Sequence, residues 1–275
     1  MGSEQYIFFR QRREYVMKVS DSISEKEQQD REDEDVARTI QQAKVVLFDH
    51  NDTLVGTMKA KWAQHKYIAS KFYGKKLTDE ELRAHWGKPM TAMIKLLYET
   101  DHINIAMSYN VATRRRFPKV LFKDTLPVLK ALRIAGKKIG IVTASPLSSI
   151  LYDFDTLKFS RQLIDYLQTE DDTAVHKPDV RAFDPAIKWL REQNILLSEA
   201  VYVGDSLDDL ESATRAGLKF IGVTTGMVTL SEFMERGALV VSELSELFTN
   251  EMLKTRRPLH WTFPKPSKLH SGKRI

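Results

Sequence analysis

Five side chains of this 275-residue sequence have the types and spacing needed for chemistry on an anionic group. Asp49 and Asp205 each end a short apolar run, Thr143 ends a third, Lys177 precedes a proline, and Asp209 follows Asp205 by four residues. A carboxylate in such a place can be a nucleophile, a metal ligand or the cap of the next helix. Phosphoryl transfer needs an in-line nucleophile and cations that balance the charge of the transferred oxygens. Together, these residues can supply both.

The apolar runs predict the strands that must position these residues. Residues 45–48 form a continuous apolar run, which is typical of a strand buried on both faces of a parallel sheet. Similar runs at 138–145, 200–205, 220–224 and 238–241 are separated by segments with helical periodicity. Strands that alternate with helices indicate a doubly wound, parallel α/β sheet. Residues at the carboxyl ends of such strands meet at one edge, where ligands bind.

A long helical segment, residues 57–118, lies between the first two of these runs and contains no convincing strand. Apolar and aromatic residues recur every three to five positions over 62–73, as on a helix with a wide apolar face. Thr78, followed three residues later by Glu81, is typical of the capping box that begins a helix. The Gly-Lys-Pro sequence at 87–89 predicts a break. We therefore expect a group of helices inserted directly after the first strand.

Four motifs occur in the order found in one enzyme family. They are Asp49-His50-Asn51-Asp52-Thr53-Leu54, Thr143, Lys177-Pro178 and Gly204-Asp205-Ser206-Leu207-Asp208-Asp209. Together they resemble the motifs of the haloacid dehalogenase superfamily, whose members are mostly phosphatases. The helical insertion resembles the cap domain of the phosphoglycolate phosphatase and β-phosphoglucomutase branch, and residues 86–89 resemble its cap loop. The resemblance covers about residues 44–247 and implies a Rossmann-like doubly wound parallel sheet with a small α-helical cap.

The resemblance also implies an activity: a Mg²⁺-dependent phosphatase that hydrolyses a small phosphorylated metabolite through an aspartyl-phosphate intermediate. Asp49 would be the nucleophile. The implied metal ligands are Asp49, Asn51 through its backbone carbonyl, Asp205 and Asp209, the last as a support or a direct ligand. The implied phosphate contacts are the Thr143 hydroxyl, the Ala144 backbone N–H, Lys177 and the cap residue Lys88. Crowded carboxyl groups would have raised pKa values without cations, so Mg²⁺ and Lys177 belong to the expected site.

Asn51 departs from the family pattern, which has an Asp two residues after the nucleophile, and Asp52 stands where Gly is usual. The family Asp protonates the leaving oxygen and later activates water, whereas an amide can donate a hydrogen bond but cannot transfer the proton. General acid–base catalysis is typically worth about 10²- to 10⁴-fold. We therefore expect slow turnover of poor leaving groups, unless His50 or Asp52 replaces the missing acid. The metal role of the Asn51 carbonyl is unaffected.

Two alternatives to a phosphatase remain open. The chain could be a family member with little or no turnover that binds a phosphate ligand or a protein partner. It could also cleave a phosphonate, because that branch lacks an acid at the position of Asn51 and uses a cap lysine; the candidates are Lys71, Lys75, Lys76 and Lys88. Haloacid dehalogenation is disfavoured, because phosphate handling better explains Thr143 together with a Mg²⁺ site.

Composition and charge set the remaining expectations. The expected parts are an N-terminal extension (1–43), an α/β core (44–56 and 119–250), a helical cap (57–118) and a basic tail (251–275). The tail carries seven bases and one acid, a net charge of +6 against +5 for the whole chain. The basicity is therefore expected in the tail and not on a face of the folded body, which argues against a nucleic-acid partner.

The sequence contains no cysteine, which excludes disulfides, thiolate catalysis and cysteine–zinc sites. No apolar run approaches the roughly 20 residues that span a bilayer. Charged residues interrupt the apolar residues near the N-terminus, unlike those of a signal peptide. We expect a cytoplasmic protein without membrane contact.

Overall fold

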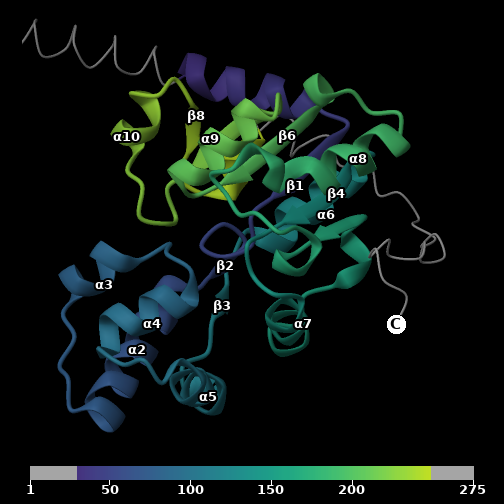
Figure 1. The fold of residues 1–275 in the computed structure, drawn as a ribbon. Helices are drawn as coiled ribbons and strands as arrows, with labels where there is room; N and C mark the ends of the chain where they lie inside the picture. The colour runs from purple at the N-terminus through teal and green to yellow at the C-terminus, as the bar shows by residue number, and fades with distance from the viewer. Residues whose placement is uncertain (1–29, 249–275) are drawn as a thin grey trace, which may run out of the picture.

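A six-stranded parallel sheet forms the centre of the computed structural model, which describes residues 30–248 (Figure 1). Its strands are β1 (Val45–Phe48), β4 (Lys138–Val142), β5 (Tyr166–Gln168), β6 (Ala200–Gly204), β7 (Lys219–Val223) and β8 (Leu239–Val241). The strand order is β5-β4-β1-β6-β7-β8, so β1 lies between β4 and β6. All four β1 side chains are buried, as their continuous apolar run predicts. The carboxyl ends of β4, β1 and β6 therefore lie next to one another.

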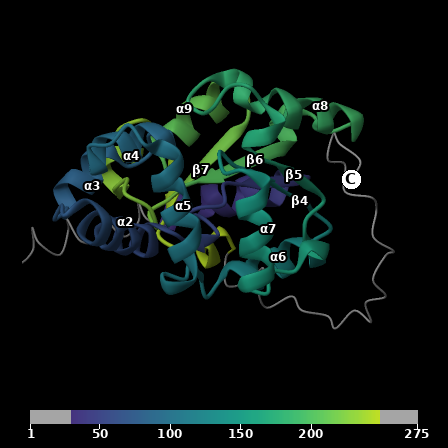
Figure 2. The same ribbon diagram turned by 60° about the horizontal axis from the view of Figure 1, so that its bottom comes forward.

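Helices cover both faces of this sheet, which confirms the predicted doubly wound fold (Figures 1 and 2). The helical residues 30–42, α6 (Thr125–Ile134) and α7 (Leu147–Thr156) bury their apolar residues in one core. The opposite core is formed with α8 (Asp184–Glu192), α9 (Leu207–Arg215) and α10 (Leu230–Met234). Two separate cores on either side of one sheet fix the positions of the strand ends between them.

Four further helices form a separate body after the first strand (Figure 1). They are α2 (Met58–Tyr73), α3 (Asp79–His85), α4 (Met90–Tyr98) and α5 (Ile103–Thr113). Ile68, Leu82, Ile94 and Leu97 are fully buried or nearly so in their own apolar cluster. The predicted capping box of Thr78 and Glu81 begins α3, and residues 86–89 separate α3 from α4.

A short two-stranded ribbon, which the sequence did not indicate, joins these helices to the sheet. It pairs β2 (Val55–Gly56) with β3 (Val120–Leu121) in antiparallel orientation. A strand of two residues is too short to show an alternating pattern, so its periodicity carries no signal.

The predicted domain boundaries remain predictions. The described part of the expected N-terminal extension, residues 30–42, is helical and buries Val36 and Ile40 in the core. Residues 1–29 and 249–275, which include the predicted basic tail, lie outside the described residues. No helix among residues 30–248 is long and apolar enough to cross a membrane.

The inserted helices are strongly basic. Residues 57–118 contain twelve Lys and Arg against five Asp and Glu, a net charge of +7. With +6 in the tail and +5 in the whole chain, residues 1–56 and 119–250 together carry −8. The prediction that the basicity belongs to the tail is therefore incomplete, because a basic insertion and an acidic remainder cancel in the sum.

Candidate active site

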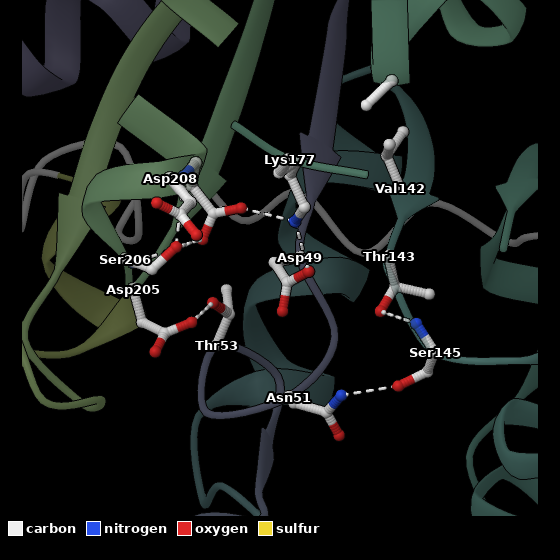
Figure 3. A network of polar contacts seen from close by, with 12 residues as sticks. Asp49, Asn51, Thr53, Val142, Thr143, Ser145, Lys177, Asp205, Ser206 and Asp208 are labelled. Atoms are coloured by element: carbon white, nitrogen blue, oxygen red, sulfur yellow. Dashed lines mark hydrogen bonds and ion pairs between the residues drawn. The ribbon is translucent and has the colours of Figure 1, made fainter. Parts of the chain in front are cut away.

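The structure brings five of the predicted residues together at the carboxyl edge of the sheet (Figure 3). Asp49 follows β1, Thr143 follows β4 and Asp205 follows β6, so three adjacent strands deliver their side chains to one place. Lys177 comes from the segment between β5 and α8, and Asp209 lies in the first turn of α9. Parallel pairing thus accounts for a cluster whose members are far apart in sequence.

Lys177 holds the centre of this cluster. Its Nζ lies 2.8 Å from Asp49 Oδ1 and 2.8 Å from the Tyr202 hydroxyl, and it also contacts Asp209 Oδ1. Burial disfavours its charged form, but the carboxylates of Asp209 and Asp49 outweigh this and raise the pKa of Lys177 above its ordinary value. Lys177 is therefore held as a cation.

Tyr202 belongs to this cluster although sequence reasoning missed it. It lies in the middle of β6, where an aromatic residue in an apolar run signals only a core position. Its hydroxyl lies 2.9 Å from the Val142 carbonyl oxygen, to which it donates, and 3.1 Å from Asp209 Oδ1. The hydroxyl thus connects the Lys177 ammonium to the backbone of the neighbouring strand.

Asp209 faces Lys177 and the start of its own helix. Its Oδ2 accepts hydrogen bonds from the backbone N–H (3.2 Å) and the hydroxyl (2.6 Å) of Ser206, which closes the capping box of α9. Its Oδ1 contacts Lys177 and Tyr202. Both carboxylate oxygens are thus engaged, which favours the supporting role over direct metal ligation. A Cβ at Gly204 would lie 2.7 Å from Asp209 Cγ, so only glycine allows this approach.

Asp49 and Asp205 have the chemistry of a magnesium site. Burial, followed by repulsion from neighbouring carboxylates, raises the pKa of Asp205 well above its ordinary value, and burial also raises the pKa of Asp49. Within residues 30–248, no three acidic or imidazole side chains converge as a complete metal cage. Mg²⁺ is commonly bound by only one or two carboxylates together with water and substrate phosphate. The two carboxylates and the Asn51 carbonyl fit that requirement.

Two contacts, neither of which the sequence reasoning anticipated, fix the Asp205 carboxylate. Thr53 donates its hydroxyl to Asp205 Oδ1 at 3.1 Å. A Cβ at Gly226 would lie 1.9 Å from Asp205 Oδ2, so the backbone of the segment after β7 packs directly against this carboxylate. A single glycine in a loop carries no sequence signal of such a contact.

The backbone conformation and the hydrogen bonds of Asp52 account for its presence where the family pattern has glycine. Its φ is 52°, a left-handed conformation that glycine adopts freely and that Asp tolerates better than most residues. Its Oδ1 accepts hydrogen bonds from the backbone N–H groups of Thr57 and Met58, both at 2.9 Å. Asp52 therefore caps the start of α2. His50 is fully buried, with Nε2 3.1 Å from Asp153 Oδ2. These contacts give no support to either side chain as the replacement for the missing acid, which stays a prediction.

Three side chains fix the orientation of the Asn51 amide. Its Nδ2 donates to Ser145 Oγ at 2.7 Å, and its Oδ1 accepts from Thr57 Oγ1 at 2.9 Å and from Lys119 Nζ at 3.1 Å. The NH₂ group therefore faces Ser145 on the β4 side, and the amide oxygen points away from Asp49 (Figure 3). Sequence reasoning did not identify Ser145 or Lys119, because their partner is a residue at which the family pattern has a different side chain.

The predicted phosphate contacts differ in their surroundings. Thr143 is buried, and its Oγ1 accepts the Ser145 N–H at 3.3 Å, which leaves its hydroxyl hydrogen for a ligand. Ala144, next to it, is exposed. Lys88 is exposed and donates to the Ala84 carbonyl at 3.2 Å. Among residues 30–248, no hydrogen bond joins it to the strand-end cluster, which consists of Asp49, Thr143, Lys177, Asp205 and Asp209. Its role in substrate binding stays a prediction.

The motif order and the fold can be compared with known proteins. A family model described as haloacid dehalogenase-like hydrolase matches residues 46–223. The chain belongs to that family. The predicted membership of the haloacid dehalogenase superfamily is thereby confirmed, and the matched residues include all four motifs.

Relatives and solved structures of this family agree with the match. A Clostridium perfringens protein named as a pyrophosphatase (PpaX) is 29% identical over 195 residues, which cover 70% of this chain and 89% of the relative. A Shigella boydii phosphoglycolate phosphatase is 25% identical over 169 residues, or 60% of each chain. Their names agree with the predicted class of enzyme, a phosphatase of the haloacid dehalogenase-like family.

Two solved structures show the same fold. A haloacid dehalogenase-like hydrolase from Bacteroides fragilis has a TM-score of 0.63 and 25% identity, and the match covers 75% of this chain and 100% of that one. CbbY from Rhodobacter sphaeroides, solved in complex with phosphate, has a TM-score of 0.64 and 21% identity over 77% of this chain and 99% of that one.

Proposed function

We propose that this chain is a Mg²⁺-dependent phosphatase that hydrolyses a small phosphorylated metabolite through an aspartyl-phosphate on Asp49. The observation that carries the proposal is the buried ammonium of Lys177, 2.8 Å from Asp49 Oδ1, at the end of the central strand. A surface lysine would not be held between two buried carboxylates. A cation beside a carboxylate nucleophile is what phosphoryl transfer requires.

Asp49 supplies the nucleophile. Its Oδ1 is bound to Lys177, while no hydrogen bond within the described part of the chain engages its Oδ2. This oxygen attacks phosphorus, and the bond between phosphorus and the leaving oxygen breaks with its electron pair on that oxygen. The Thr143 hydroxyl and the Ala144 N–H donate to the transferred oxygens, and Lys177 balances their charge. Water then hydrolyses the acyl phosphate and restores the Asp49 carboxylate.

Asp49, the Asn51 carbonyl and Asp205 would hold Mg²⁺, with water and phosphate oxygens completing its ligands. When bound, the ion supplies positive charge to the transferred phosphoryl group. Asp209 serves this site indirectly, because it orients Lys177 and begins α9 at the correct place.

Asn51 limits the leaving groups that the site can handle. Its Nδ2 can donate a hydrogen bond to the leaving oxygen but cannot give it a proton. Leaving groups of low basicity, such as phosphate from an anhydride or a phenolate, need that proton least, whereas an alkoxide needs it most. We therefore propose a preference for phosphoanhydrides and aryl or acyl phosphates over alkyl phosphates. The name of the relative from Clostridium perfringens, a pyrophosphatase, agrees with this preference.

Phosphate release from a panel of anhydrides, aryl phosphates and alkyl phosphates, with and without Mg²⁺, tests the proposal. The natural sequence is compared with Asp49→Asn and Asn51→Asp. Mg²⁺-dependent turnover that disappears in Asp49→Asn supports it. Turnover by Asn51→Asp alone would favour the alternative of a phosphate-binding protein with an intact but inactive scaffold. If none of the three proteins releases phosphate from any compound of the panel, the result would count against the proposed phosphatase.

The phosphonate alternative gains no support from the contacts of its candidate lysines. Lys75 pairs with Glu99 at 2.7 Å, Lys88 donates to the Ala84 carbonyl of α3, and Lys71 and Lys76 are exposed. No hydrogen bond in residues 30–248 joins any of them to the strand-end cluster.

A further inference from the structure

A second group of charged side chains, all cations except one, lies on the side of Asn51 away from the nucleophile. Lys61 comes from α2, Arg114 begins the short helix η1 (Arg114–Arg116), and Lys119 precedes β3. Asp153 of α7 is the carboxylate among them. Three elements of the insertion and its ribbon thus converge on one element of the core.

Lys119 connects this group to the loop after β1 that carries Asp49 and Asn51. Its Nζ lies 2.7 Å from Asp153 Oδ2 and 3.1 Å from Asn51 Oδ1. Asp153 is shared, because the same oxygen lies 3.1 Å from His50 Nε2. Only 15% of the Lys119 side chain is exposed, so its ammonium is directed into the molecule.

Among the described residues 30–248, no carboxylate forms an ion pair with Lys61 or Arg114. Lys61 Nζ donates to Gln64 Oε1 at 3.2 Å, and Gln64 in turn donates to Thr113 Oγ1 at 2.9 Å, directly before Arg114. The Arg114 guanidinium carbon lies 3.7 Å from the ring centroid of Tyr152, the residue before Asp153. Within residues 30–248, neither Lys61 nor Arg114 takes part in an ion pair.

The charges in this group act on one another. Burial and then repulsion from Lys119 lower the pKa of Lys61 to about 8; Arg114 adds to that repulsion, and Asp153 opposes it. A half-buried lysine among like charges is unfavourable for folding. An anion placed between these cations would remove that repulsion and accept charge-assisted hydrogen bonds from them.

We propose that Lys61, Arg114 and Lys119 form a second anion subsite beside Asn51. The substrate would then carry a carboxylate or a second phosphate in addition to the phosphoryl group that is transferred. The placement follows from the Asn51 amide, whose NH₂ faces Ser145 and whose oxygen points away from Asp49 (Figure 3). That oxygen accepts a hydrogen bond from Lys119 Nζ at 3.1 Å. The subsite therefore lies beyond the phosphoryl position, where the remainder of the substrate would extend. This inference rests on the proposed function.

Binding of matched phosphonates, measured by titration calorimetry with Mg²⁺, tests the subsite without requiring turnover. Phosphonoacetate is compared with phosphonoacetamide, and the homologues with one and two more methylene groups are compared likewise, since each pair differs in a single charge. For at least one length, the natural protein should bind the carboxylate at least about tenfold more tightly than the amide. Equal affinities at every length would overturn the subsite.

Neighbouring residues provide matched controls. In Lys61→Met and Arg114→Met, the ratio of the two dissociation constants should fall toward one. It should be retained in Lys59→Met and Arg115→Met, which remove the same charges from exposed positions of the same helices. Lys61→Gln serves as a second variant if Lys61→Met does not fold. A ratio that all variants retain, or that the controls lose equally, contradicts the assignment.

Phosphate release from phenyl phosphate, and its loss in Asp49→Asn, tests the proposed function separately. A ratio of dissociation constants that depends on the charge, without turnover, would support the subsite and contradict the proposed phosphatase. Turnover with a ratio of one would reject the subsite and keep the phosphatase.

Discussion

The two sides of the Asn51 loop have opposite electrostatics. On the side of the nucleophile, the carboxylates of Asp49 and Asp209 share the cation of Lys177, and Asp205 lies beside them without an ion pair among residues 30–248. On the other side, Lys61, Arg114 and Lys119 act on one another, and within residues 30–248 only Lys119 of these three forms an ion pair, with Asp153. Each side is thus short of the counterion that the other has in excess, and only the Asn51 loop separates them.

This difference supports both the proposed magnesium site and the proposed anion subsite. Uncompensated buried carboxylates attract a divalent cation, and uncompensated buried cations attract an anion. A substrate with two anionic groups, together with Mg²⁺, would complete both sides at once. The following changes break or sharpen this contrast, from the largest expected effect to the smallest.

Removal of the nucleophile should have the largest effect. Asp49→Asn leaves the shape of the site but removes the attacking oxygen anion, so the rate of phosphate release should fall by at least about 10³-fold. Steady-state assays with Mg²⁺ measure the rate, and circular dichroism verifies the fold. A variant that keeps more than a tenth of the activity would remove Asp49 from the reaction.

Restoring a carboxyl group at position 51 should come next. Asn51→Asp supplies a general acid, so hydrolysis of alkyl phosphates should rise by about 10²-fold or more. Hydrolysis of anhydrides should change much less, because their leaving group needs no proton. A uniform rise across the panel would show that Asn51 limits binding and not proton transfer.

Two neighbouring acids in the first turn of α9 allow the contact with Lys177 to be distinguished from a general effect of negative charge at the start of this helix. Asp209→Asn removes one of the two carboxylates that hold the Lys177 ammonium, and kcat should fall roughly tenfold to a hundredfold. Asp208→Asn, at an exposed position one residue earlier, should change kcat less than threefold. Equal losses in both variants would mean that the negative charge of the helix start matters, and not the contact with Lys177.

In the absence of a ligand, Lys61 should show the smallest effect of these changes, and that effect should be on stability. Its pKa is lowered from 10.5 to about 8, so the unfolded chain binds more protons between these values and stability rises with pH through that window. Below pH 8 the full cost is present, and Lys61→Met at pH 7 should therefore stabilise the protein by about 1–2 kcal/mol, or ~3–6 °C in Tm. Lys59→Met, which removes an exposed charge, should leave Tm almost unchanged. Thermal unfolding at pH 7 and 9.5 tests both, and the gain should shrink at the higher pH.

The catalytic edge of the sheet could be predicted because each of its residues lies at the end of an element with a strong pattern. The apolar runs before Asp49, Thr143 and Asp205 determine both the strand and the place of the residue that follows it. Parallel pairing then leaves little freedom in how these ends meet.

The remaining residues of the site could not be predicted, because their positions depend on tertiary contacts. Tyr202 has the pattern of an ordinary core residue, and Gly226 is a glycine in a loop. Lys61 lies on α2 together with Lys59, Lys66 and Lys71, and nothing in the sequence pattern marks one of these four lysines as more buried than the others. The cation group beside Asn51 is assembled from α2, η1 and the residue before β3, whose relative positions no local periodicity determines.

The ribbon between the two bodies has a consequence for motion. Thr57 directly follows β2 and Lys119 directly precedes β3, and both donate to the same atom, Asn51 Oδ1. A rotation of the inserted helices about this ribbon would therefore turn the amide with them or break these two hydrogen bonds. Any such motion would thus be coupled through Asn51 to the geometry of the loop that carries Asp49.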